Sequence, residues 1–510
     1  MAFLTINGWE IPVAEVTKST EYLGTYKRVF NGSLRDSTSA VKRKWNITTT
    51  PLTYNDAYTL RNILISNGDH FGFDNIAGNT GWDTTIGNFI VSDKGVVATS
   101  GTATWRPLEG PNNLNAIAVE KATTNLLSQN AASFETDLTG WTITSSGVTI
   151  SNPSDGGYHG SKYIMFYGNA SDTAFGMESP FITGISPGDQ ISFSWYERHN
   201  TNLSSISGSS PYNPPAIIFY NNTPTEISRV NLTNLGERNS NWHRHSITAT
   251  APANTSQIKV RIGYDLPNFQ YLNHAIDAVQ VEKSSFPTSF TLSTRNAVTP
   301  IVGNFTVFNK NEMSIFLTIN PLEITAADFN IFAIYTTYPY SGADTSLIFL
   351  SFNNITGNVQ ISLMDSSIIY NNYPNIMTLS LNTFNKIGIT FNSSIGKLRA
   401  FLNGLKVYET STNYTLYSSN GKCQIGAPNY HSILFSNILV LPFAASDSFA
   451  TAYTNTNTYH KIPYVTISGD IVNNQQIMCF PEVQDADYLQ FSNNGTWTTG
   501  QKVKFSLLEV

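Results

Sequence analysis

Two histidines alternate in the stretch "WHRH", at His243 and His245. If this stretch is a β-strand, both side chains lie on one face, because successive strand residues point to opposite faces. Such a pair could bind a metal ion, or it could form a contact that changes with pH near neutrality. No third ligand accompanies the pair, so the pattern alone does not predict a metal site.

Sequence patterns typical of enzymes are scarce. The chain has no P-loop, C-x-x-C or H-E-x-x-H motif. Paired carboxylates could serve glycoside hydrolysis, but neither "WYERH" nor "GYDL" identifies such a pair. The sequence therefore favours a protein that binds rather than one that catalyses.

Basic residues gather near the N-terminus around one helical stretch. Paired with acidic residues of a neighbouring copy, they would fix partner choice in an assembly. Alternatively, they form a solvated edge that protects exposed strands. We favour an assembly interface, because the rest of the chain devotes so little charge to solubility. The residues are Arg35, Lys42, Arg43, Lys44 and Arg61.

Composition indicates a β-rich chain of several domains. Its 510 residues exceed what one core supports, and only 13% are charged, against ~25% in typical soluble proteins. A net charge of −6 does not suggest nucleic-acid binding. We expect no membrane span and no signal peptide in "MAFLTINGWEIPV". Cys423 and Cys479 are expected to be buried thiols, although a disulfide between them is an alternative.

The elements that would position these residues are mostly short alternating strands, so we expect an all-β fold. One helix is predicted in "PLTYNDAYTLRNILISNGD", capped by Thr53 or Asn55 and followed by a stop at Asn67-Gly68. Asp56 favours the first turn of this helix. Its apolar face comprises Ala57, Leu60, Ile63 and Leu64.

Four segments follow from the distribution of strands and turns. Residues 1–118 form a base β-domain with the flanking helix, 119–295 form a β-sandwich, and 296–463 form a second sandwich. In the latter, Asn403-Gly404 predicts a tight hairpin. Residues 464–510 are too few for their own core, so we expect their strands to complete the base domain.

Two of these segments resemble known β-sandwich families. The blocks "TNLLSQNAASFETDLTGWTI", "DGGYHGSKYIMFYG" and "AIDAVQVEKSSFPTSF" resemble the galactose-binding-type sandwiches of carbohydrate-binding modules. The opening and closing blocks also resemble modules common in tailed-phage virion proteins. The blocks "FNKIGITFNSSIGKLRAFLNGLKVYET", "CQIGAP" and "ILFSNILVLPFAAS" resemble laminin-G/concanavalin-like jelly rolls.

The first segment resembles the base domains of siphophage tail proteins, of the tube or distal-tail kind. The resembling residues are "FNGSLRDSTSAVKRKWNITTTPLTYNDAYTLRNIL" and "FGFD". Members of that family are β-sandwiches with a flanking helix that assemble into rings. This resemblance implies an assembly role for the five basic residues.

The resemblance to carbohydrate-binding modules implies two sites. Glu135 and Asp277 stand where that family holds a structural calcium with backbone carbonyls, and oxygen ligands suit this ion. Two ordinary surface carboxylates are the alternative. Sugar binding would use exposed aromatic rings, but Trp195 and Tyr196 lie on opposite strand faces, so at least one is core. The candidates are Trp195, Tyr196, Trp242 and Tyr271, with Tyr220 and Tyr264 also considered.

Together these features predict a virion structural protein of a phage tail (tube, distal tail or tail tip). We do not expect it to be an enzyme. It would be assembled in the host cytoplasm, with itself and other virion proteins as partners, and its sandwiches would touch host-surface glycans. One alternative is a capsid decoration or head-fibre protein. Another is a secreted polysaccharide-active enzyme with binding modules.

Overall fold

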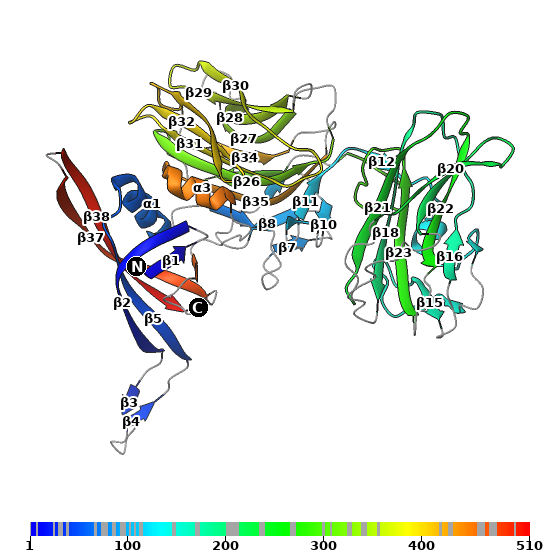
Figure 1. The fold of residues 1–510 in the computed structure, drawn as a ribbon, viewed down its shortest axis with the longest axis horizontal. Helices are drawn as coiled ribbons and strands as arrows, with labels where there is room; N and C mark the ends of the chain where they lie inside the picture. The colour runs from blue at the N-terminus through cyan, green and yellow to red at the C-terminus, as the bar shows by residue number, and fades with distance from the viewer. Residues whose placement is uncertain are drawn as a thin grey trace. The chain divides into compact units, whose positions relative to one another are not determined.

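The computed structural model of the chain confirms the all-β fold class (Figure 1). One flanking helix was predicted, whereas the described part contains three, because the short helices α2 (Gln129–Ser133) and α3 (Asp447–Asn455) carry weak local patterns. The structure describes residues 2–6, 9–23, 26–28, 34–36, 40–65, 69–72, 80–83, 88–91, 98–100, 104–106, 109–111, 116–144, 149–168, 174–199, 214–233, 240–265, 272–297, 301–305, 309–323, 329–337, 344–353, 357–417, 421–426, 432–455, 465–468, 477–493 and 496–509.

Both ends of the chain contribute strands to one closed barrel. Two seams join the ends, since β1 pairs with β36 and β5 pairs with β38. Alternation turns apolar side chains such as Leu4, Ile11, Trp45 and Phe505 into the buried interior. The strands, in barrel order, are β1 (Ala2–Ile6), β2 (Trp9–Leu23), β5 (Ala40–Thr49), β38 (Thr496–Glu509), β37 (Ile477–Asn493) and β36 (Val465–Ser468).

Helix α1 (Tyr54–Ile65) starts where the sequence predicts. Thr53 caps it, because the Asp56 N–H donates to Thr53 Oγ1 at 3.2 Å and the Thr53 hydroxyl donates back to Asp56 Oδ2 at 2.8 Å. The predicted stop at Asn67-Gly68 lies outside the described residues. The predicted apolar face is buried, at Ala57, Leu60, Ile63 and Leu64.

Residues 301–455 supply most strands of two further sheets. The predicted hairpin is present, with positive φ at Asn403 (49°) and Gly404 (85°), as its tight turn requires. One sheet has the order β10 (Thr104–Arg106), β11 (Ala116–Val119), β35 (Ile433–Leu441), β26 (Glu312–Pro321), β31 (Asn385–Asn392), β32 (Lys397–Leu402) and β33 (Leu405–Ser411), with β6 (Asp69–Gly72) on β35. The other has the order β30 (Tyr370–Thr378), β29 (Asn358–Met364), β28 (Asp344–Asn353), β27 (Phe329–Thr337), β34 (Gly421–Ile425), β25 (Ile301–Phe305) and β9 (Ala98–Ser100).

The strands between residues 69 and 119 correct one boundary. Residues 1–118 were predicted to lie in the base domain, but β6 and β11 pair with β35, and β9 pairs with β25. Their partners lie far away in the chain, so local sequence could not reveal these pairings. Added strands also cover sheet edges that would otherwise be exposed.

One hydrophobic cluster joins the barrel, α1, α3 and the adjoining sheet, including Trp9, Leu60, Phe316, Leu439 and Phe449. Residues 1–119 and 299–510 accordingly form one compact unit, and residues 120–298 form a second. Cys423 and Cys479 lie on β34 and β37, and their side chains are outside the described set. Among the described residues, no helix is long and apolar enough to cross a membrane.

The second unit is built from two sheets around a separate core. Its first and last strands, β12 (Thr123–Thr124) and β24 (Thr294–Arg295), pair with each other, which is the geometry of an inserted domain. One sheet contains β13 (Thr142–Ile143), β16 (Ala174–Glu178), β22 (Gln257–Asp265), β19 (Ala216–Tyr220) and β20 (Glu226–Asn231), with β17 (Ile182–Thr183) on β22. The other contains β14 (Thr149–Ser151), β15 (Ile164–Gly168), β23 (Leu272–Glu282), β18 (Gln190–His199) and β21 (His243–Thr250).

Candidate functional site

Strand β18 divides its side chains between two faces of its sheet. Phe193 and Trp195 point into the core of the second unit, and Trp195 is 0% exposed. The prediction that Trp195 contacts a ligand is therefore wrong, because alternation places its ring between the sheets. Tyr196 lies on the opposite face, which we call the outer face.

An aromatic–arginine cluster occupies the outer face. It consists of Tyr158, Tyr163, Tyr196, Arg198 and Trp242. The ring of Tyr158 stacks on Tyr196 with centroids 3.5 Å apart, so Tyr196 is only 2% exposed. The Arg198 guanidinium lies 4.9 Å from the Tyr163 ring and 4.7 Å from the Trp242 ring. Tyr158 and Trp242 are half-buried, so they are the aromatic rings of the cluster that solvent reaches.

This cluster suits a ligand with both apolar and hydroxyl-bearing surfaces. Aromatic faces pack against CH groups, and the guanidinium of Arg198 can donate to oxygens. Arg244 lies 5.7 Å from the Tyr196 ring and donates to Ser194 Oγ at 2.9 Å, which fixes its position. Of the predicted aromatic candidates, the structure brings Tyr196 and Trp242 to this cluster. Tyr271 lies outside the described residues.

The two predicted calcium ligands meet the same loop, residues 155–162. Glu135 accepts hydrogen bonds from the backbone N–H groups of Ser161 (3.0 Å) and Lys162 (2.8 Å). Asp277 Oδ2 accepts from the backbone N–H of His159 at 2.8 Å. Two carboxylates from distant parts of the chain therefore bracket one loop.

Their ionisation differs. Burial favours the neutral form of Glu135, but the hydrogen bonds from Lys162 and Ser161 outweigh it and lower the pKa of its carboxyl. Burial raises the pKa of Asp277 to about 7, with the Glu135 charge adding to the rise and hydrogen bonds from His159 and Ala278 opposing it. A cation between them would relieve the cost of ionising Asp277.

The loop also brings several oxygen atoms close together near Gly157. A Cβ at Gly157 would lie 2.5 Å from the Lys162 carbonyl oxygen, 2.8 Å from Asp277 Oδ2 and 3.2 Å from the His159 carbonyl oxygen. Only glycine fits this position. Several oxygens around a small space, with carboxylates beside them, are a donor set that fits Ca²⁺.

The core face of the same sheet carries a second group of polar side chains. His199 Nε2 lies 2.7 Å and His274 Nε2 lies 3.1 Å from Glu197 Oε1. The indole N–H of Trp195 donates to Glu197 Oε2 at 3.1 Å. Burial opposes ionisation of Glu197, but the surrounding histidines, His274 and His245 first, hold the pKa of its carboxyl well below its usual range.

The sequence pattern reveals only part of this group. His243 and His245 share one face of β21, as predicted, and His245 is 8% exposed. His199 and His274 were missed. They are far apart in the sequence and become opposite partners only when β18 pairs with β23. No local spacing could have revealed them.

The five predicted interface residues lie on three separate elements, β4 (Leu34–Asp36), β5 and α1. Lys42, Arg43 and Lys44 lie along β5, where they face Glu21, Thr20 and Ser19 of β2. Arg35 lies on β4, which pairs with β3 (Tyr26–Arg28), and its side chain is outside the described set. Arg61 is exposed on α1.

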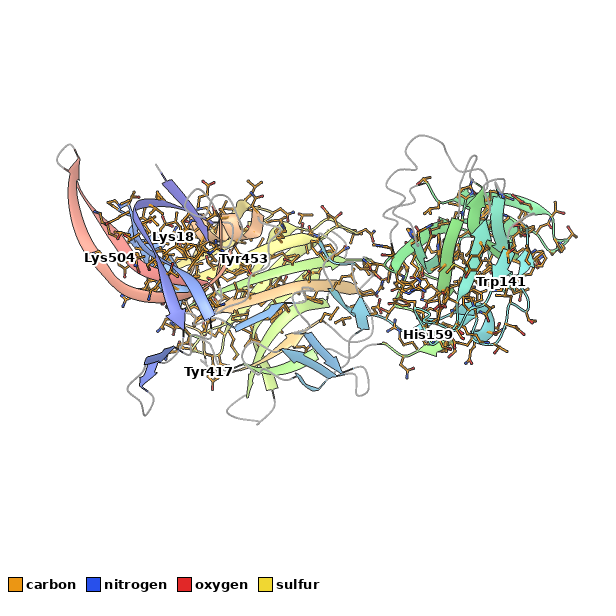
Figure 2. All side chains as sticks on the ribbon, turned by 90° about the horizontal axis from the view of Figure 1, so that it is seen from below. Lys18, Trp141, His159, Tyr417, Tyr453 and Lys504 are labelled. Atoms are coloured by element: carbon orange, nitrogen blue, oxygen red, sulfur yellow. The ribbon has the colours of Figure 1, made fainter. Side chains whose placement is uncertain are left out.

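The strands that carry this charge extend past the barrel as two-stranded ribbons (Figure 1). Thr17, Lys18, Ser19 and Thr20 of β2 are exposed on both faces (Lys18 is labelled in Figure 2). Among described strands, this part of β2 pairs only with β5. A second ribbon is formed by β37 and β38.

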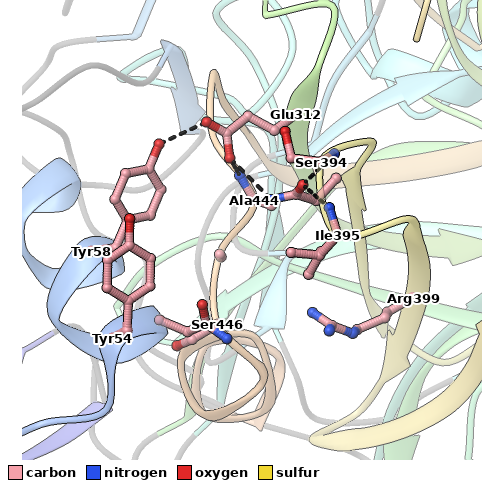
Figure 3. Close-up of a pocket in the computed structure, with 11 residues that line it drawn as sticks. Tyr54, Tyr58, Glu312, Ser394, Ile395, Arg399, Ala444 and Ser446 are labelled. Atoms are coloured by element: carbon pink, nitrogen blue, oxygen red, sulfur yellow. Dashed lines mark hydrogen bonds between the residues drawn. The ribbon is translucent and has the colours of Figure 1, made fainter. Parts of the chain in front are cut away.

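A pocket of about 270 Å³ lies between α1 and the neighbouring sheet (Figure 3). Tyr54, 56% exposed, stacks on Tyr58 with ring centroids 6.2 Å apart. The Tyr58 hydroxyl donates to Glu312 Oε1 at 2.7 Å, and burial together with this carboxylate raises the pKa of Tyr58. Arg399 lines the opposite side. The pocket thus combines an aromatic ring, a carboxylate and a guanidinium, which suits a polar ligand.

No protein-family model matches this chain, and no curated protein sequence matches it. Among solved structures, the enzymatically active domain of tailspike protein 4 from bacteriophage CBA120 is 14% identical, with 31% of this chain and 21% of that chain covered and a TM-score of 0.24. This chain thus spans about a fifth of that tailspike structure.

Two binding modules are also similar in part. The CBM40 module of Ruminococcus gnavus IT-sialidase is 12% identical, with 29% of this chain and 84% of that chain covered and a TM-score of 0.24. The CBM22-1 xylan-binding domain of Paenibacillus barcinonensis Xyn10C is 17% identical, with 32% and 96% covered and a TM-score of 0.23. At these identities and scores, the likenesses assign neither a family nor a function to this chain.

Proposed function

We propose that this chain is a structural adhesion protein of a bacteriophage tail. The barrel joins copies of the chain and other virion proteins, and the inserted sandwich binds host-surface glycans. The observation that carries the proposal is the outer part of β2, where Thr17, Lys18, Ser19 and Thr20 are exposed and, among described strands, pair only with β5.

Among the described residues, strand β38 pairs with β5 only at residues 44–48, so residues 40–43 of β5 continue with β2 as a two-stranded ribbon, which is at best marginally stable in water. Contact with a neighbouring subunit would bury it and pair its open edge. Lys42, Arg43 and Lys44 on β5 are basic, so acidic residues of a neighbouring subunit would complement them. A contact between different surfaces of two copies would repeat head to tail and build a ring or a tube.

The test is the solution mass of the full chain, measured by light scattering at low and high salt. We expect oligomers that become smaller as salt screens the ribbon charges. The variant Lys42→Glu/Arg43→Glu/Lys44→Glu should be monomeric at concentrations where the wild type assembles. Lys310→Glu, an exposed substitution away from the ribbon, is the control. A wild type that stays monomeric under all conditions contradicts the assembly proposal.

Glycan binding rests on the aromatic–arginine cluster of the outer face. A glycan array probed with the full chain identifies the ligand class, and isothermal titration with the best ligand measures affinity. Tyr54→Ala in the pocket of Figure 3 determines whether a second site contributes. Failure to bind any glycan contradicts adhesion through sugars. The assembly proposal would not be affected, because the solution mass of the chain tests it separately.

Calcium is proposed as a structural ion at the 155–162 loop. Glu135, Asp277 and the carbonyls of His159 and Lys162 would hold it, and its charge would fix the loop that carries Tyr158. Thermal unfolding with Ca²⁺ or with chelator should show stabilisation by Ca²⁺ that is lost in Asp277→Asn. Equal unfolding temperatures in both conditions contradict this assignment.

Two alternative functions predict other outcomes. Antibody labelling of particles distinguishes a tail location from a capsid or head-fibre location. Release of reducing sugar from a polysaccharide panel would indicate an enzyme instead. One pattern, Gly184-Ile185-Ser186-Pro187-Gly188, matches the G-x-S-x-G motif of hydrolases. It does not support this alternative, because it lies in a turn between β17 and β18 rather than between a strand and a helix.

A further inference from the structure

Glu197, His199 and His274 place three metal-binding atoms together inside the sandwich core. These atoms lie within 4.8 Å of one another, and the three residues are at most 2% exposed. Glu197 and His199 come from the end of β18, and His274 comes from the start of β23. The pairing of His199 with His274 stacks their rings at 4.5 Å with an interplanar angle of 13°.

This arrangement constrains where positive charge can reside. A buried carboxylate must be compensated, because desolvating it costs several kcal/mol. Protonating both stacked imidazoles would put like charges face to face. A divalent cation bound by two neutral imidazoles and one carboxylate would instead neutralise Glu197 without that repulsion.

We propose that Glu197, His199 and His274 form a structural binding site for Zn²⁺ or a similar borderline divalent ion. Two imidazole nitrogens with one carboxylate oxygen are a ligand set that Zn²⁺ uses in proteins, where a water molecule completes the tetrahedron as the fourth ligand. Ligand atoms around tetrahedral Zn²⁺ are roughly 3.3 Å apart, given bond lengths of about 2.0–2.1 Å. The separations of 2.7 and 3.1 Å here are shorter, and the two imidazoles are stacked, so binding requires the side chains to move apart and one ring to turn until both Nε2 atoms face the ion.

Trp195 acts as a positioning residue for this site. Its indole N–H donates to Glu197 Oε2, so the other carboxylate oxygen, Oε1, faces both imidazoles. Such outer hydrogen bonds orient metal ligands and raise affinity. The bound ion would tie β18 to β23 at one end of the sheet. The proposal is independent of glycan binding and of assembly.

The test uses the untagged full chain, since a polyhistidine tag would bind the same ions. After chelation and dialysis, Zn²⁺ and Co²⁺ are titrated separately, with binding followed by calorimetry and by the visible absorption of Co²⁺. We expect one ion per chain, a Co²⁺ spectrum typical of tetrahedral coordination, and a higher unfolding temperature with Zn²⁺. Calcium should not compete, because its proposed ligands lie on the outer face.

Variants assign the site. His199→Gln and His274→Gln should each abolish stoichiometric binding, and Trp195→Phe should weaken it by about 10–100-fold. The matched control is His159→Gln, a half-buried histidine of the outer-face loop that lies outside the three-residue group. It should keep one ion per chain.

Three results would each overturn the proposal. One is the absence of stoichiometric Zn²⁺ and Co²⁺ binding, which would make the group a buried ion network only. Another is binding that persists in folded His199→Gln and His274→Gln variants. If those variants do not fold, the Co²⁺ spectrum of the wild type decides, and bands without tetrahedral character would contradict the site.

Discussion

Two buried carboxylates occupy opposite faces of one sheet, and their surroundings give them opposite properties. Glu197 lies on the core face among histidines, whereas Asp277 lies on the outer face beside a loop that offers backbone oxygens and N–H groups. They are neighbours across β18 and β23, since Asp277 pairs with Tyr196, the residue before Glu197. Their pKa values move in opposite directions, down for Glu197 and up for Asp277.

Burial alone therefore does not decide the charge of a carboxylate. Both side chains are at most 2% exposed, so the desolvation that opposes ionisation acts on both. The difference comes from the neighbouring groups. Nitrogen bases surround Glu197 and suit a borderline metal ion, whereas the oxygens near Asp277 suit a hard one. One strand pair thus separates two carboxylates for which we propose different cations.

The largest expected effect is on the core face. Glu197→Gln removes the charge but keeps the shape, and it leaves the histidines without their counterion. Removing one partner of a buried ion pair costs about 3–5 kcal/mol in unfolding free energy. Urea unfolding with chelator present measures this loss. Glu226→Gln, which breaks an exposed pair with Arg229, is the control and should cost no more than about 1 kcal/mol. If Glu197→Gln and Glu226→Gln lost similar amounts of unfolding free energy, the histidines around Glu197 would not depend on its charge.

A smaller effect is expected at the outer face, and it depends on pH. The folded pKa of Asp277 is about 7, above its ordinary value of 3.8, so between these values the folded chain holds a proton that the unfolded chain has released. Without calcium, this group should lower stability by a few kcal/mol as pH rises from about 4 to about 7.

Other groups near Asp277 also titrate in this pH range. The contribution of Asp277 must therefore be measured as a difference in stability between the wild type and a variant. Glu135 faces the same loop and His159 belongs to it, and both have lowered pKa values. Subtracting the pH profile of Asp277→Asn from that of the wild type, each in chelator, isolates the Asp277 contribution. Adding calcium should abolish the fall in this difference with rising pH. A difference that rises with pH would show that Asp277 is ionised in the calcium-free fold.

Local patterns predicted the local structure well. Helix α1 was predicted because Thr53 and the spacing of Leu60, Ile63 and Leu64 act within a few residues. The Asn403-Gly404 hairpin has the same cause, since its turn geometry depends on those two residues. The short strands between residues 69 and 119 were misplaced, because pairing with β35 and β25 is decided far away in the chain.

The candidate sites show the same limit. Strand alternation separated Trp195 from Tyr196, but it could not say which ring was buried in the core. The stacking of Tyr158 on Tyr196 depends on a loop that tertiary contacts hold in place. His199 and His274 meet only through strand register.

The smallest expected effect concerns glycan affinity, and it again distinguishes the outer face of the sheet from the core face. Trp242→Ala removes a half-exposed ring from the outer face, and it should weaken glycan binding about tenfold, or about 1.4 kcal/mol, with little change in stability. Trp195→Phe alters the core face, so it should lower stability and leave glycan affinity unchanged. Phe181→Ala, an exposed ring that contacts Tyr220 of the other sheet, controls for the loss of a surface aromatic. If Trp195→Phe weakened glycan binding as much as Trp242→Ala, the two faces would not act separately, because a core ring can affect an outer ligand only through the sheet between them.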